Sequence, residues 1–155
     1  MASTDSLAML QNLADDKLHQ TAAQLGKTRQ DHQQAIVQLG RLTGYQREYC
    51  QKMQTSMIEK GMKVIDIHLY QTFLNDLNNV VFLQEQQVEH CEERVESMLI
   101  LWRQDKQRLN AFNILNKRAE VTHALNESRR EQKLMDDFAQ RLSRGKDEYA
   151  HKLNH

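Results

Sequence analysis

Apolar residues recur every three or four positions along two long stretches of the chain, and the pattern is interrupted once, near Gly61. Residues with this spacing form a stripe on one face of an α-helix, as in coiled coils. Proline, the strongest helix breaker, is absent from all 155 residues. The sequence therefore predicts an all-α fold, a long antiparallel two-helix coiled-coil hairpin that turns at the interruption.

The first predicted helix runs from about residue 6 to about residue 57, with Asp5 or Ser6 as its N-cap. Its stripe is expected to form one side of a seam between the helices. The stripe consists of Leu7, Ala14, Leu18, Thr21, Leu25, Thr28, His32, Ala35, Leu39, Leu42, Gln46, Tyr49 and Met53. Three apolar residues flank it: Leu10, Ala22 and Ile36.

The turn is predicted at about residues 58–65, with Gly61 ending the first helix because glycine readily adopts a positive φ angle. The second helix is predicted from about residue 66 to residue 149, followed by a flexible tail over 150–155. Its stripe consists of Ile67, Tyr70, Leu74, Leu77, Val81, Gln84, Val88, Cys91, Val95, Met98, Trp102, Asp105, Leu109 and Phe112. The chain is thus expected to form a single hairpin domain.

A turn centred near residues 61 and 62 predicts which seam residues lie opposite one another. Five pairs follow: Thr21 with Trp102, Ala14 with Leu109, Ala35 with Val88, His32 with Cys91, and Leu39 with Gln84. The first three set a large side chain against a small one, as close packing requires. The other two place polar groups in the seam, where they lower stability but fix the alignment of the helices.

The second helix is predicted to extend beyond the first, because Leu7 reaches only to about Asn116. The stripe shifts at Leu109, Phe112 and Leu115, and it then resumes as Val121, Leu125, Ser128, Gln132, Met135, Ala139 and Leu142. An apolar stripe without an intramolecular partner indicates a binding face for another protein. The alternative is that this segment frays or folds back in solution.

Composition and charge exclude several classes of function. The 21 basic and 21 acidic residues cancel, so no general field attracts nucleic acid or anionic lipid. The longest apolar run, Met98 to Trp102, is far shorter than the roughly 20 residues of a membrane-spanning helix. The first residues also lack the pattern of a secretory signal. We therefore expect a cytoplasmic chain without nucleic acid or direct membrane insertion.

No common signature of nucleotide binding or zinc hydrolysis occurs, and a thin two-helix fold cannot easily enclose a substrate. Cys50 and Cys91 are too far out of register for a disulfide. His32, His90 and Cys91 do not supply the four ligands of a structural zinc site, which favours a packed polar layer. The sequence predicts a protein that is not an enzyme and has no cofactor or metal.

Four segments of the sequence resemble the FliJ family, cytoplasmic components of the bacterial flagellar type III secretion apparatus. They agree with that family at positions outside the seam as well as within it, which makes the resemblance specific. The segments are Leu42 to Tyr49 (LTGYQREY), Tyr70 to Leu77 (YQTFLNDL), Trp102 to Arg118 (WRQDKQRLNAFNILNKR) and Glu127 to Arg141 (ESRREQKLMDDFAQR). The resemblance implies a hairpin similar to the rotor-stalk subunit of rotary ATPases.

The resemblance also implies two contact regions. The paired chain ends and the extension would enter the pore of the hexameric export ATPase and promote its assembly and activity. The candidate ring contacts are Arg118, Arg129, Arg130, Lys133, Met135, Phe138 and Arg141. The turn end would face the membrane export gate, through Gln38, Leu42, Tyr45, Tyr49, Phe73 and Leu77.

Tyr45 and Phe73 lie off the stripe, which by itself fits either packing beside the seam or an exposed anchor for a partner; the resemblance favours the anchor. It also implies an escort role for export chaperones, contact with the ATPase regulator, and a location at the flagellar basal body, peripheral to the inner membrane. The chain departs from the family in having fewer aromatic residues around its turn and in the tail Asp147 to His155.

Two other functions fit the same sequence. A general substrate chaperone would hold export cargo along the exposed apolar stripe. A passive coiled-coil scaffold would dimerise through the extension of the second helix. Stoichiometric binding of cargo distinguishes the first, and an elongated dimer without effect on an ATPase distinguishes the second.

Overall fold

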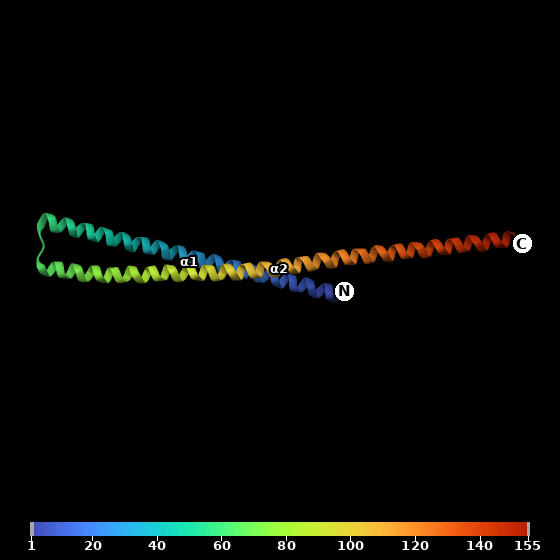
Figure 1. Ribbon diagram of the computed structural model, residues 1–155, viewed down its shortest axis with the longest axis horizontal. Helices are drawn as coiled ribbons and strands as arrows, with labels where there is room; N and C mark the ends of the chain where they lie inside the picture. The colour runs from blue at the N-terminus through green and yellow to red at the C-terminus, as the bar shows by residue number, and fades with distance from the viewer. Residues whose placement is uncertain (1, 155) are drawn as a thin grey trace. The chain divides into compact units, whose positions relative to one another are not determined.

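The computed structural model describes residues 2–154, and these form two helices that pack against each other as a hairpin (Figure 1). Helix α1 spans Ala2–Lys60 and has 59 residues. Helix α2 spans Val64–Leu153 and has 90 residues. The predicted all-α hairpin with a longer second helix is confirmed.

Both helices extend further than the sequence pattern indicated. Helix α1 begins at Ala2 instead of residue 6 and ends at Lys60 instead of residue 57. Asp5 therefore lies in the first turn, where its carboxylate favours the positive end of the helix dipole. Helix α2 continues to Leu153, so residues 150–153 of the predicted tail are helical, with His151 and Lys152 in the last turn. His155 lies outside the described residues.

The turn is shorter than predicted and consists of residues 61–63. Gly61 has a φ angle of 65°, and no other residue in the described part of the chain has a positive φ. The main-chain N–H of Ile67 donates a 3.1 Å hydrogen bond to the carbonyl oxygen of Lys63, which begins the hydrogen-bond ladder of α2. Gly61 thus ends α1 in the way that the sequence predicted.

The core of the hairpin is a seam one layer thick. Every residue that the sequence placed on the two stripes from Leu7 to Met53 and from Ile67 to Phe112 is buried or half-buried. The most enclosed apolar residues are Ala14, Leu25, Ala35, Val81 and Cys91. None of the described side chains is less than 2% exposed. A two-helix seam leaves part of each side chain in contact with water.

The chain divides into two compact units. One unit contains Asp15–Gln107, and the other contains the residues up to Ala14 together with those from Arg108 onward. In the first unit the seam carries polar contacts between the helices: the Thr21 hydroxyl with the Asp105 carboxylate, the Gln84 amide with the Ala35 carbonyl oxygen at 3.0 Å, and the Gln46 amide with the Asn78 side chain.

These contacts lie about one turn to either side of the predicted pairs, so the register itself is not shifted. Thr21, expected opposite Trp102, donates its hydrogen bond to Asp105. Gln84, expected opposite Leu39, reaches the main chain of Ala35 instead. A seam side chain packs between residues of the facing helix, so a polar group finds its partner one turn along. Cys91 accepts a long hydrogen bond from Gln87 of its own helix, at 3.7 Å.

Candidate functional site

The two helices form a shallow groove near the turn end of the hairpin. The groove has a volume of about 320 Å³ and is lined by Tyr45, Glu48, Tyr49 and Lys52 of α1 and by Phe73 and Leu77 of α2. Four of the six predicted gate contacts are therefore brought together here. Of the other two, Gln38 is exposed and Leu42 half-buried further back along α1, and neither lines the groove.

Tyr49 is the centre of an aromatic cluster at the floor of this groove. Its ring lies 4.5 Å from that of Phe73 at an interplanar angle of 48°, and 5.4 Å from that of Tyr70 in a stacked arrangement. Such offset and tilted pairs stabilise packing beyond the area that they bury. Phe73 therefore both packs on Tyr49 and keeps half of its surface exposed.

Tyr45 differs from its neighbours because it is 61% exposed and takes part in no ring contact with them. Large aromatic side chains at the rim of a groove are favoured anchors for protein partners. Glu48 and Lys52 are the charged members of the lining and follow Tyr45 along the same helix. The groove thus offers an apolar floor with one acidic and one basic group beside it.

The Tyr70 hydroxyl forms a hydrogen bond with the Cys50 thiol, a contact that the stripe pattern did not predict. This hydrogen bond, followed by burial and by the charges of Cys50 and Tyr49, raises the pKa of Tyr70 above its ordinary value of 10.0. Tyr70 is therefore protonated throughout the physiological range. Cys50 and Cys91 are both free thiols, as the register predicted.

The far part of α2 does not pack against α1. From Val121 to Asn154 every side chain is exposed. The predicted ring contacts all lie on this stretch or directly before it, and all are exposed: Arg118, Arg129, Arg130, Lys133, Met135, Phe138 and Arg141. We call the segment from Val121 to Ala150 the free segment.

The free segment has an apolar face with a basic edge. Leu134, Met135, Phe138 and Leu142 are exposed apolar residues, and at about 100° per residue they lie within about 100° of one another, on one side of the helix. At about 100° per residue, Arg130 and Arg141 border this side. Arg129 points to the opposite side of the helix, so the predicted ring contacts do not form one surface.

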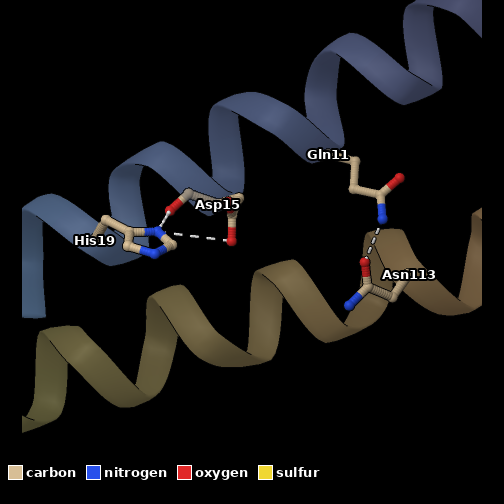
Figure 2. A network of polar contacts seen from close by, with 4 residues as sticks. All are labelled: Gln11, Asp15, His19 and Asn113. Carbon is tan, nitrogen blue, oxygen red and sulfur yellow. Dashed lines mark hydrogen bonds and ion pairs between the residues drawn. The ribbon is translucent and has the colours of Figure 1, made fainter.

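Two hydrogen bonds join the helices shortly before the free segment. The Gln11 amide donates a 2.5 Å hydrogen bond to Oδ1 of Asn113, as Figure 2 shows, and Asn116 donates a 2.8 Å hydrogen bond to Oε1 of Gln11. Gln11 was not predicted to lie in the seam, because the apolar stripe steps from Leu7 to Ala14 without it. The only sign of its role in the sequence was its position midway between two stripe residues.

His19 and Asp15 form a separate contact on the surface of α1 (Figure 2). The imidazole Nδ1 lies 2.8 Å from the main-chain oxygen of Asp15 and 3.7 Å from its carboxylate. The main-chain hydrogen bond, followed by the charge of Asp15, raises the pKa of His19 above its ordinary value of 6.5. The His19 side chain is exposed and Asp15 is half-buried, so the contact lies at the surface beside the seam.

Comparison with known proteins gives matches over nearly the whole chain. The family model described as "Flagellar FliJ protein" matches residues 3–148. The chain belongs to the flagellar FliJ protein family. It is similar to the Flagellar FliJ protein of Escherichia coli (strain K12), with 36% identity over 148 residues that cover 96% of this chain and 100% of the relative. The Flagellar FliJ protein of Salmonella typhi is 35% identical over 148 residues, which again cover 96% of this chain and 100% of the relative.

Membership of the FliJ family confirms the resemblance that the four sequence segments indicated. The match ends at residue 148, so most of the tail Asp147 to His155 lies beyond it. Within residues 2–154 no helix is long and apolar enough to cross a membrane. In the same part of the chain no three His, Cys, Asp or Glu side chains are grouped to hold a metal ion.

Proposed function

We propose that this FliJ-family chain is a non-enzymatic component of the flagellar type III protein export apparatus. In this role it is a central stalk that promotes assembly and activity of the hexameric export ATPase and links it to the membrane export gate. The observation that carries the proposal is the free segment, a helical stretch with an exposed apolar face and no partner among the described residues.

The free segment is suited to the pore of a ring. Its apolar residues, among them Met135 and Phe138, provide area to bury, and Arg130 and Arg141 provide charges that pair with acidic groups. A single asymmetric helix cannot contact six identical subunits alike. It therefore favours different states in different subunits, which is how a bound stalk changes the activity of the ring.

The groove near the turn is the proposed contact for the cytoplasmic domain of the export gate. Tyr45 and Phe73 expose aromatic surface at its rim, while Tyr49 holds the floor in place through two ring contacts. The gate contact and the ring contact lie in different compact units of the chain. Substitutions in one are therefore expected to leave the other intact.

Two further roles belong to the same proposal but have no assigned residues: escort of export chaperones and contact with the ATPase regulator. The exposed apolar face also fits a general substrate chaperone. That function predicts stoichiometric binding of unfolded export cargo without a change in ATP hydrolysis.

The deciding experiment is steady-state ATP hydrolysis by the cognate flagellar export ATPase, titrated with the full chain and with a version truncated after Arg118. We expect the full chain to stimulate hydrolysis and the truncated chain not to. The truncated chain keeps the paired seam and the Gln11 contacts with Asn113 and Asn116, so its melting curve by circular dichroism serves as the control for folding. Equal stimulation by both chains would exclude the free segment as the working part, and stimulation by neither would favour the chaperone or scaffold.

A further inference from the structure

A stripe of residues on the free segment keeps the spacing of a coiled-coil seam. Its members come alternately four and three positions apart, and all of them are exposed. The stripe consists of Val121, Leu125, Ser128, Gln132, Met135, Ala139 and Leu142. A spacing kept over about three heptads is typical of a helix that packs lengthwise against another helix.

The stripe faces away from helix α1. Leu109 and Phe112 belong to the seam of α2, and both are half-buried there. At about 100° per residue, Val121 lies about 180° around the helix from Phe112, and Leu125 lies about 160° from Leu109. A further helix can therefore pack along the stripe without meeting α1.

Three charged residues border the stripe, each about 80° from its centre line. Arg129 and Asp136 lie on one border, and Glu131 lies on the other. The other charged or titratable side chains from residue 121 to residue 144 lie about 130° or more from the centre line. They are His123, Glu127, Arg130, Lys133, Asp137, Arg141 and Arg144. The charges beside the stripe are therefore one basic and one acidic residue, seven positions apart, on one border and one acidic residue on the other.

We propose that two copies of this chain pair through the stripe as antiparallel helices, with Ser128 of one copy opposite Ala139 of the second copy. Arg129 then lies beside Asp136 of the second copy, on the same border of the seam. Because the pair is symmetric, Asp136 likewise lies beside Arg129 of the second copy. Two ion pairs thus form from one border, and charge complementarity identifies the occupant of the stripe as a second copy of the chain.

The same register brings the residues of the stripe together in layers. Large apolar side chains meet toward the ends of the contact and small ones meet between them, as close packing of two helices requires. The pairs are Leu125 with Leu142, Ser128 with Ala139, Gln132 with Met135, and Val121 with Lys146, each occurring twice. Lys146 continues the stripe at its end, where the stem of a lysine packs and its ammonium group reaches water.

Neighbouring alignments bring like charges together instead. A slide of the second copy by one heptad in one direction sets Asp136 beside Asp136, and a slide in the other direction sets Arg129 beside Arg129. A parallel pair sets Glu131 of one copy beside Asp136 of the second. Like charges at these positions oppose pairing, so the charges favour the antiparallel register with Ser128 opposite Ala139.

The stripe overlaps the apolar face that we propose for the ring but is not identical with it. Met135 and Leu142 belong to both surfaces. Arg129 borders the stripe, whereas Arg130 borders the apolar face and lies opposite the stripe. A paired chain therefore covers part of the face proposed for the ring. The pairing needs only the chain itself, so it goes beyond the stalk function and does not rest on it.

The test is sedimentation equilibrium of the full chain over a range of concentrations, with the dissociation constant of the dimer as the measured quantity. We expect a monomer–dimer equilibrium for the unaltered chain. Arg129→Glu alone, or Asp136→Arg alone, turns two attractions into two repulsions in the symmetric pair and is expected to weaken it about ten-fold. The two changes together exchange the charges and are expected to restore pairing to within about three-fold of the unaltered chain.

Arg144→Glu is the matched control for charge, because Arg144 lies on the side of the helix opposite the stripe, and it should pair like the unaltered chain. Leu125→Asn is expected to abolish the dimer. Ile100→Asn is its control, since Ile100 is 54% exposed and Leu125 is 52% exposed on the same helix, and it should leave the dimer intact. Circular dichroism checks that each variant keeps its helicity.

Three results would overturn the proposal: a chain that stays monomeric, a dimer that survives Leu125→Asn, or a double reversal that does not restore pairing. ATPase stimulation by the same variants reports separately on the stalk function. A monomeric chain that still stimulates the ATPase would leave that function standing and overturn the pairing alone.

Discussion

The hydroxyl Oγ1 of Thr21 in α1 donates a 2.5 Å hydrogen bond to Oδ2 of Asp105 in α2, across the seam of the hairpin. Both side chains are buried, and no buried side-chain nitrogen or oxygen among the described residues is left without a hydrogen bond. A polar pair of this kind fixes the alignment of two helices more strictly than apolar residues do, because a shift of one helix leaves both groups unpaired.

Replacement of Thr21 by Val removes the donor and leaves the Asp105 carboxylate buried without it. We expect a loss of about 1–3 kcal/mol in the free energy of unfolding, the usual cost of an unsatisfied buried group. Urea denaturation followed by circular dichroism measures this loss. The double variant Thr21→Val with Asp105→Leu removes both polar groups, and we expect it to recover most of the stability. No recovery would mean that the two residues do not act as a pair.

Replacement of Gly61 by Ala tests the turn. Its φ angle of 65° is unfavourable for a residue with a Cβ atom, so we expect a loss of about 1 kcal/mol in the free energy of unfolding, although no atom lies within 4 Å of the added group. Gly26→Ala is the matched control in the middle of α1, where the same added methyl group also meets nothing within 4 Å. We expect Gly26→Ala to stabilise the helix by about 0.5–1 kcal/mol. Effects of the same sign would contradict the assignment of the turn.

The seam was the part of the fold that the sequence predicted best, because helical periodicity follows directly from which residues avoid water. Even the polar members Thr21 and Asp105 were placed on it by spacing alone. Their partnership was not predicted, since a hydrogen bond along the seam depends on side-chain reach within one turn. Gln11 was missed for the same reason. Cys50, which contacts the stripe residue Tyr70, lies beside the stripe of α1, where periodicity carries no information.

The candidate site residues likewise include some that the sequence grouped correctly and some that it did not. The family resemblance assigned Tyr45, Tyr49, Phe73 and Leu77 to one contact region, and in the structure these four residues line one groove. Helix geometry separates Arg129 from Arg130, although the two are adjacent in sequence.

The pH dependence of His19 follows from its raised pKa. Because the folded-state pKa exceeds the ordinary value of 6.5, protonation favours the folded chain; this contribution to stability is present below pH 6.5 and is lost as the pH rises through the folded-state pKa. NMR titration of the imidazole protons should therefore give a pKa above 6.5. Asp15→Asn is expected to lower it only partly, because the main-chain oxygen of residue 15 remains in place. A return to the ordinary value in that variant would assign the effect to the carboxylate instead.

Reversal of charge on the free segment tests the ring contact. We expect Arg130→Glu to reduce stimulation of the export ATPase about ten-fold, because Arg130 borders the apolar face that contains Phe138. Arg129→Glu places the same change on the opposite side of the helix and is expected to have a smaller effect. Both variants should retain the helicity of the unaltered chain in circular dichroism, and equal loss of helicity and stimulation would argue against a direct contact.

Substitution at the rim of the groove tests the gate contact. Tyr45→Ala with Phe73→Ala removes exposed aromatic surface, and we expect binding to the cytoplasmic domain of the gate to fall at least ten-fold in a pull-down or by calorimetry. ATPase stimulation should be unchanged, because these residues lie in the other compact unit. Tyr49→Ala serves as a comparison, since its ring packs on both Tyr70 and Phe73 and its loss should lower the melting temperature as well.

The unbroken backbone of α2 also determines how the chain tolerates changes in length. Each residue of an α-helix advances the direction of the following side chains by about 100°. A single deletion just after Arg118 would therefore turn the whole apolar face of the free segment around the helix axis, with every side chain of that face retained. A deletion of seven residues at the same place would nearly restore its direction and only shorten the helix. A series of deletions from one to seven residues would thus show whether a partner requires the apolar face to point in one direction or requires the helix to have its full length.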